Sequence, residues 1–172
     1  KMLASQINPH FLYNTLETIR MKALVNKQRE IADLVKMLAK LMRRNIQVGD
    51  KMVTIKSEIE FIQYYLKIQD YRFGDRIVSE VIVDDDIDIN AKVLPLVIQP
   101  FVENAFVHGL EGVEKDGKLS IIIEREIEII KITVQDNGTG MDNFQLSELR
   151  GILMSNIETK DRIHIGINNV NQ

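Results

Sequence analysis

The chain has 172 residues, enough for one ordinary domain or two small ones, and its 45% hydrophobic and 27% charged residues are the balance of a folded globular protein. A formal net charge of -3 argues against a nucleic-acid-binding surface, which needs a concentrated positive field. The lack of cysteine excludes disulfides, thiolate metal sites and thiol nucleophiles, and no apolar run approaches the roughly 20 residues that span a bilayer.

Residues 1–48 are predicted to form two helices joined by a polar connection at residues 26–29. Each helix carries one apolar stripe at helical spacing. The stripes consist of Leu12, Leu16, Ile19 and Ala23 in the first helix and of Ile31, Leu34, Val35, Leu38, Leu41 and Met42 in the second. One hairpin cannot bury both stripes, so we expect two hairpins to pair into a four-helix bundle and the protein to be a homodimer.

A third helix is predicted to follow the hairpin. Ser57 with Glu60 makes a capping box at its start, and Gly74 is placed as its left-handed end. We therefore place a domain boundary near residue 56. This gives a helical hairpin over residues 1–56 and a second domain over residues 57–172.

The second domain alternates strands and helices, which predicts an α+β fold. The predicted elements are a strand over residues 77–83, a helix over residues 95–109, two strands over residues 119–124 and 129–135 that form a hairpin, a glycine loop over residues 136–141 and a mobile lid over residues 142–165. Pro100 falls inside the predicted helix, where it removes one backbone hydrogen bond and implies a bend.

Polar side chains mark the first helix as a candidate site. Gln6, His10 and Asn14 are four residues apart, so they share one helix face, away from the apolar stripe. A neutral imidazole is a competent nucleophile toward a phosphoryl group, and Asn14 can hydrogen-bond the ring or orient a water. Pro9 is expected to free a backbone carbonyl and to bend the helix beside His10. The alternative is that Asn8 caps the helix, Pro9 is its first residue and His10 is an exposed bystander.

The predicted helix over residues 95–109 carries a second group of polar side chains. Glu103, Asn104 and His108 are the polar members of an otherwise apolar segment, and Asn104 and His108 share a face. The side-chain oxygen of Asn104 suits Mg²⁺, a hard ion that binds through few protein ligands and through nucleotide phosphates. The alternative is a buried helix whose polar residues simply face solvent.

The glycine loop directly follows a predicted strand. Asp136, at the strand end, can accept a hydrogen bond from an adenine amino group, and Gly138 and Gly140 allow a tight turn and the close approach of a ligand. By itself this loop also fits a hairpin turn or an imperfect calcium loop. Gly166 precedes an alternating apolar and polar run, and backbone amides at such a helix start can hold phosphate.

These segments, in this order, resemble those of the LytS/YehU-type sensor histidine kinases. The run NPHFLYNTL around His10 resembles their phosphoacceptor helix, and VIQPFVENAFVHG resembles their N box. VQDNGTGM resembles their G1 box, and HIGINNV resembles a degraded G2 box. FIQYYLKIQDYRFGDR resembles the segment between the family's two domains, so the resemblance covers essentially the whole chain.

The resemblance implies a role for each matching residue. His10 would be phosphorylated, Asn104 would coordinate Mg²⁺ and Asp136 would bind the adenine amino group. The two glycines of the loop after Asp136 would let it turn beside the adenine, and Gly166 would lie at the lid hinge near the phosphates. Residues 57–172 would form the Bergerat α/β sandwich of the GHKL ATPases.

The chain also departs from the family pattern. Phe11 stands where most histidine kinases carry an acid immediately after the phosphoacceptor, and Glu17 lies about two turns away, roughly 10 Å along the axis. Glu103 would reach His10 only when the ATP-binding domain docks. His164 replaces the usual first glycine of the G2 box, and the chain is expected to stop before the family's final strand.

We therefore predict ATP-dependent autophosphorylation of His10, with Asn14 and Glu103 as further catalytic residues and with His108 among the nucleotide-binding residues. ATP and Mg²⁺ are the expected cofactors, and an aspartate of a response-regulator receiver domain is the expected acceptor. The parent protein is expected to be anchored in the plasma membrane outside this cytoplasmic segment. The alternative is a dimeric regulatory scaffold with a degenerate nucleotide site, which the weak G2 box and Phe11 favour.

Overall fold

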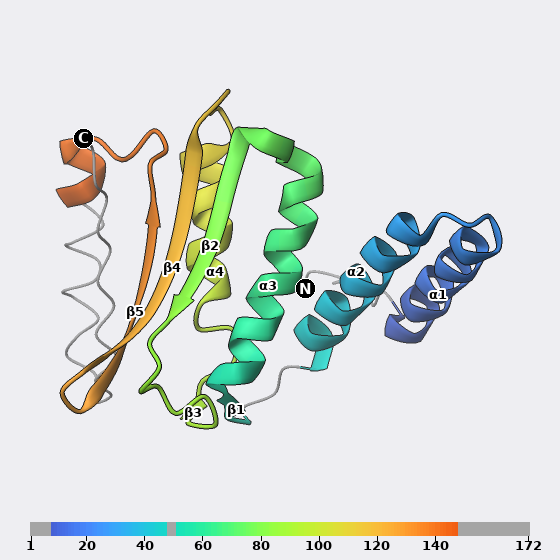
Figure 1. Ribbon diagram of the computed structural model, residues 1–172, viewed down its shortest axis with the longest axis horizontal. Coiled ribbons are helices and arrows are strands. Elements are labelled where there is room, and N and C mark those ends of the chain that lie inside the picture. The colour runs from blue at the N-terminus through green and yellow to red at the C-terminus, as the bar shows by residue number, and fades with distance from the viewer. Residues whose placement is uncertain (1–7, 48–50, 148–172) are drawn as a thin grey trace, which may run out of the picture. The chain divides into compact units, whose positions relative to one another are not determined.

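The computed structural model describes residues 8–47 and 51–147 (Figure 1). The chain falls into two compact units, Lys1–Arg72 with Ile89–Val97 and Phe73–Asp88 with Ile98–Gln172. This division concerns packing alone, so the functional boundary near residue 56 stays a prediction. None of the helices in the described ranges has the length and apolar character of a membrane span.

The first unit begins with the predicted helical hairpin, α1 (Pro9–Val25) and α2 (Arg29–Gln47). The side chain of Asn8 caps α1 by accepting a hydrogen bond from the backbone N–H of His10 at 3.0 Å, and Pro9 is the first helical residue. A proline at this position costs no helical hydrogen bond. The predicted bend beside His10 is therefore wrong, and the alternative is correct for the cap at Asn8 and the helix start at Pro9.

The two helices of the hairpin pack through small side chains. Ala23 and Ala32 are buried, and α1 contacts α2. Ile19, Ile31 and Leu38 remain 45%, 44% and 41% exposed, although all three belong to the predicted apolar stripes. A single hairpin thus leaves large apolar side chains of both stripes exposed to solvent.

Helix α3 (Ile55–Phe73) follows the short strand β1 (Val53–Thr54), which pairs antiparallel with β3 (Lys92–Val93). The Oγ1 atom of Thr54 accepts a hydrogen bond from the backbone N–H of Ser57 at 3.1 Å, so Thr54 caps the helix. The predicted capping box of Ser57 and Glu60 is wrong, because α3 begins earlier and both residues lie inside it.

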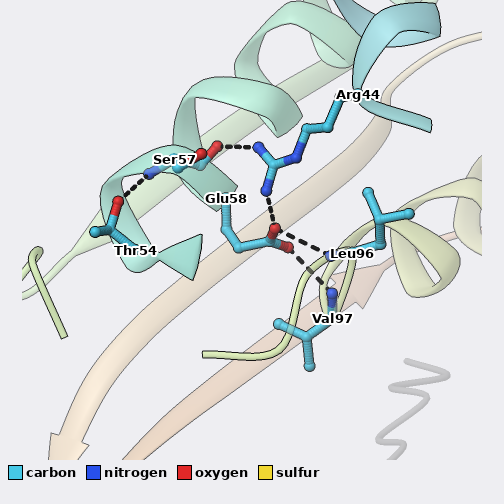
Figure 2. A network of polar contacts seen from close by, with 6 residues as sticks. All are labelled: Arg44, Thr54, Ser57, Glu58, Leu96 and Val97. Carbon is cyan, nitrogen blue, oxygen red and sulfur yellow. Dashed lines mark hydrogen bonds and ion pairs between the residues drawn. The ribbon is translucent and has the colours of Figure 1, made fainter. Parts of the chain in front are cut away.

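A buried carboxylate joins three segments of the first unit (Figure 2). Glu58 of α3 pairs with Arg44 of α2, and it accepts hydrogen bonds from the backbone N–H groups of Leu96 at 3.0 Å and Val97 at 3.1 Å. Arg44 also donates to the carbonyl of Ser57. Leu96 has a φ of 58°, a left-handed conformation that is rare for a bulky side chain, and the Glu58 carboxylate stabilises this turn.

The second unit contains a three-stranded mixed sheet in the order β2 (Ile77–Val83), β4 (Gly117–Glu126) and β5 (Ile129–Asp136). Strands β2 and β4 are parallel, and β4 and β5 form the predicted antiparallel hairpin. The inward side chains of β4, Leu119, Ile121 and Ile123, are fully buried. A short helix, α4 (Gln99–Asn104), continues as η2 (Ala105–Leu110), which packs on β4 and β5 (Figure 1). The whole is an α+β fold.

The helix predicted over residues 95–109 begins later and changes its winding. Because α4 starts at Gln99, Pro100 stands in its first turn, where the missing N–H is not needed. The predicted start at Pro95 and the predicted bend at Pro100 are therefore wrong. From Ala105 the helix is a π-helix, a wider winding that is frequent at functional sites.

Candidate functional site

The imidazole of His10 is exposed in the first turn of α1. Its Nδ1 atom lies 3.3 Å from Nδ2 of Asn14, one turn along the same face. Within the described ranges, Asn14 is the one side chain hydrogen-bonded to this ring. Phe11, the next residue, is 66% exposed. Gln6 lies outside the described residues.

Glu17 is the first acid along α1 after His10, and it is engaged elsewhere. Arg20 donates to the Glu17 carboxylate from Nε at 2.9 Å and from Nη2 at 2.5 Å. These hydrogen bonds lower the pKa of Glu17 below its ordinary value, which makes the carboxylate a weaker base. Glu17 is therefore a poor candidate for accepting a proton from His10.

The end of β5 meets the end of η2 in the second unit. Asp136 is half-buried, and its Oδ1 atom accepts a hydrogen bond from the backbone N–H of Gly138 at 2.9 Å. Thr139 then binds the helix end, since its N–H donates to the carbonyl of Gly109 at 3.0 Å and its Oγ1 donates to the carbonyl of His108 at 3.0 Å. The structure thus brings together the predicted adenine residue, the glycine loop and the helix of the N box.

Close contact explains the glycines at this junction. A Cβ atom on Gly138 would lie 2.1 Å from the carbonyl oxygen of Gly109, and a Cβ atom on Gly109 would lie 2.5 Å from Oδ1 of Asp136. Gly140 has a φ of 68°, which favours glycine. Gly138 is therefore required for packing of the loop against the helix end, in addition to any approach by a ligand.

Sequence reasoning missed three residues that hold this junction: Gly109, Asn137 and Thr139. The Asn137 side chain accepts from the N–H of Lys118 at 2.6 Å and donates to the carbonyl of Asp116 at 2.9 Å, which ties the loop to the start of β4. A signal existed for Asn137 and Thr139, because short polar side chains in a loop after a strand commonly bond nearby backbone.

The polar side chains of the N-box helix differ in their surroundings. Glu103 is half-buried and accepts a hydrogen bond from Gln99, one turn before it. Asn104 and His108 are exposed, as both a ligand role and the solvent-facing alternative require. Asn104 ends α4 and His108 lies in the π-helix, so the two do not repeat at ideal α-helical spacing.

The described residues offer few protein ligands to a magnesium ion. Residues 8–47 and 51–147 contain no group of three or more acids or histidines that could hold a metal by themselves. Asn104 offers one hard oxygen, which fits an ion that is held chiefly by nucleotide phosphates. Gly166, the other residue predicted near the phosphates, lies outside the described residues. Of the predicted lid, residues 148–165 also lie outside them, and residues 143–147 are helical.

Comparison with known proteins identifies the family. Residues 1–77 match the family model described as histidine kinase. Sensor histidine kinase YesM of Bacillus subtilis is 36% identical over 168 residues, which cover 96% of this chain and 29% of YesM. Sensor protein LytS of Oceanobacillus iheyensis is 34% identical over 171 residues, which cover 99% of this chain and 29% of LytS. The chain belongs to the LytS-type sensor histidine kinases.

Other relatives of this sensor histidine kinase segment agree. Sensor histidine kinase BtsS of Escherichia coli is 34% identical over 139 residues, which cover 80% of this chain and 24% of BtsS. The chain thus spans between 24% and 29% of the length of these three relatives. The solved structure of the Acinetobacter baumannii histidine kinase AdeS shares 16% identity at a TM-score of 0.40, with 80% of this chain and 74% of AdeS covered, a likeness too weak to carry an argument.

Proposed function

We propose that this segment transfers the γ-phosphoryl group of Mg-ATP to His10 and then passes it to an aspartate of a response-regulator receiver domain. The observation that carries this proposal is the exposed His10, hydrogen-bonded to Asn14 through Nδ1, in a chain that belongs to the sensor histidine kinases. An exposed imidazole nitrogen can approach a phosphoryl group in line with its leaving oxygen.

The second unit is the proposed nucleotide site. One oxygen of Asp136 accepts the N–H of Gly138, which leaves the other oxygen available for an adenine amino group. Asn104 and His108, both exposed, are the proposed partners of Mg²⁺ and the phosphates, with Gly166 at the phosphate end. We propose that residues 57–172 adopt the Bergerat arrangement.

The proposed chemistry asks the protein mainly for alignment and charge neutralisation. Mg²⁺ would neutralise phosphate charge when it is bound. His10 supplies the nucleophilic nitrogen, Asn14 orients the ring, and Glu103 is the acid proposed to approach His10 during transfer.

We propose a homodimer formed by the hairpins over residues 1–56. The support is the exposure of Ile19, Ile31 and Leu38, which a second hairpin would cover in a four-helix bundle. We also propose that the parent protein is membrane-anchored outside this segment and that the segment is cytoplasmic.

Incubation with γ-labelled Mg-ATP tests the proposed function. The wild-type protein should acquire a label that acid removes and base does not, as expected for phosphohistidine. The His10→Gln variant should take no label while it binds ATP with unchanged affinity. A wild-type protein that binds ATP and takes no label would favour the scaffold alternative, and a labelled His10→Gln variant would exclude His10 as the acceptor.

A further inference from the structure

The contact between His10 and Asn14 determines which ring nitrogen is reactive. A neutral imidazole carries one N–H and one lone pair, and only the nitrogen with the lone pair can attack phosphorus. Nδ1 of His10 faces the amide nitrogen of Asn14 at 3.3 Å. An amide NH₂ group only donates, so Nδ1 accepts in this arrangement and the ring proton lies on Nε2. The Nε2 atom then has no lone pair to offer.

We propose that Asn14 is the positioning residue that sets the tautomer of His10, an inference that rests on the proposed function. A half turn of the Asn14 carboxamide exchanges its two ends, which have nearly the same shape. This brings Oδ1 to Nδ1, selects the tautomer with the proton on Nδ1, and places the lone pair on Nε2 of the exposed ring. Asn14 thus allows a resting and a reactive ring without moving the helix.

Among the described residues, Asn14 is the side chain placed to do this. Phe11 offers no hydrogen-bonding group, and Glu17 is bonded to Arg20. Oγ1 of Thr18 donates a hydrogen bond to the backbone carbonyl of Asn14 at 2.8 Å. This bond does not involve the Asn14 side chain, so it does not restrain the carboxamide. The Asn14 side chain is exposed, so its amide has room to rotate.

The proton balance separates an amide from an acid at this position. In the reactive tautomer, the Nε2 lone pair of His10 bonds to the γ-phosphorus, the bond to the bridging oxygen breaks, and ADP leaves with the electron pair. The ring keeps its proton on Nδ1 and is positively charged until that proton passes to water. The Asn14 oxygen can accept a hydrogen bond from Nδ1 but is too weak a base to take the proton. A carboxylate would lock the reactive tautomer and stabilise the cation.

Nitrogen-15 NMR of the imidazole rings tests the inference without nucleotide. The chain has three histidines, so the His10 signals can be assigned as those absent from the His10→Gln variant. At alkaline pH, where the rings are neutral, the wild-type ring should show its proton mainly on Nε2. Asn14→Asp should move the proton to Nδ1. Asn14→Ala should give the values of a free, solvent-exposed ring, and Thr18→Val, the matched control, should give the wild-type values.

Phosphorylation kinetics supply the second readout. Asn14→Ala lacks the oxygen that accepts a hydrogen bond from Nδ1 of the reactive ring, so it should take label about five- to tenfold more slowly. Asn14→Asp should take label faster than wild type, because its carboxylate favours the reactive tautomer. Identical His10 tautomers in wild type and Asn14→Asp would overturn the inference, even if His10 is labelled normally. A wild-type protein that takes no label would instead refute the proposed function, and the NMR comparison would still decide the role of Asn14.

Discussion

At the scale of single residues, the two ends of the nucleotide site should respond separately to substitution. In the Asp136→Asn variant, the amide oxygen can still accept the N–H of Gly138. The amide NH₂ group then faces the adenine amino group, and two donors cannot hydrogen-bond to each other. ATP and ADP should therefore bind about tenfold more weakly, with or without Mg²⁺, and the preference over GTP should fall. Calorimetric titration measures both effects, and unchanged affinity and base preference would mean that the adenine pocket lies elsewhere.

Asn104 acts at the other end of the same site. Asn104→Ala should leave binding of ATP in the presence of a chelator close to that of wild type, because the adenine contact does not involve this residue. It should reduce the additional affinity that Mg²⁺ confers and should slow labelling of His10. An equal loss of affinity with Mg²⁺ and with chelator would contradict the assignment.

Local spacing predicted some of these residues well and could not predict others. The contact between His10 and Asn14 follows from a four-residue spacing on one helix, which any α-helix produces. Glu58 was missed because its backbone donors, on Leu96 and Val97, are 38 and 39 residues away. In sequence it looks like the neighbouring Glu60, which is exposed.

At the scale of elements, the junction between the glycine loop and η2 should be sensitive to added atoms. Gly138→Ala places a methyl group 2.1 Å from a backbone oxygen, so the loop must move. We expect a loss of about 1–3 kcal/mol in the free energy of unfolding, together with weaker ATP binding. Denaturant unfolding provides the measurement. Gly112→Ala is the matched control, because nothing lies within 4 Å of its added Cβ atom, and equal stability of the two variants would contradict this packing.

The Glu58 carboxylate should be important for the stability of the first unit. Glu58→Gln removes the charge that pairs with Arg44 and leaves the guanidinium partly buried without its partner. The free energy of unfolding should fall by about 3 kcal/mol or more. Glu60→Gln, at an exposed site on the same helix, should change it by less than about 0.5 kcal/mol. A Glu58→Gln variant as stable as Glu60→Gln would show that the network in Figure 2 contributes little.

Strands were easier to predict than helix starts. The strand over residues 77–83 has the predicted bounds, and the hairpin strands are one to four residues longer than predicted. Runs rich in β-branched residues between turn residues are typical of strands, which is why these elements could be predicted. The start of α4 was misplaced because two prolines, Pro95 and Pro100, both fit a first helical turn. Leu96 donates its backbone N–H to Glu58 and has a left-handed conformation, which excludes residue 96 from a helix.

At the scale of the whole molecule, the exposed apolar side chains of the hairpin should determine the oligomeric state. Ile31 and Leu38 are seven residues apart on α2 and are 44% and 41% exposed. The double variant Ile31→Lys/Leu38→Lys should be monomeric by light scattering, because a charged pair in a bundle seam would oppose association. Ile127→Lys, at an 88% exposed position of the β4–β5 turn, is the control and should remain dimeric. A double variant that still dimerises would place the interface elsewhere.

Substitution is a sharper test of the dimer than deletion of the hairpin. Removal of residues 1–49 would also remove Arg44 and leave Glu58 buried without its guanidinium partner. A shortened chain could then fail to fold for a reason unrelated to the dimer interface.

His10 is the residue that we propose receives the phosphoryl group. Fragmentation mass spectrometry of the wild-type protein after incubation with Mg-ATP, with all steps kept near neutral pH, locates the phosphoryl group among the three histidines. We predict that it lies on His10, with lower occupancy in the Asp136→Asn variant under the same conditions. A phosphoryl group on His108 or His164, or equal occupancy of His10 in Asp136→Asn, would contradict the account.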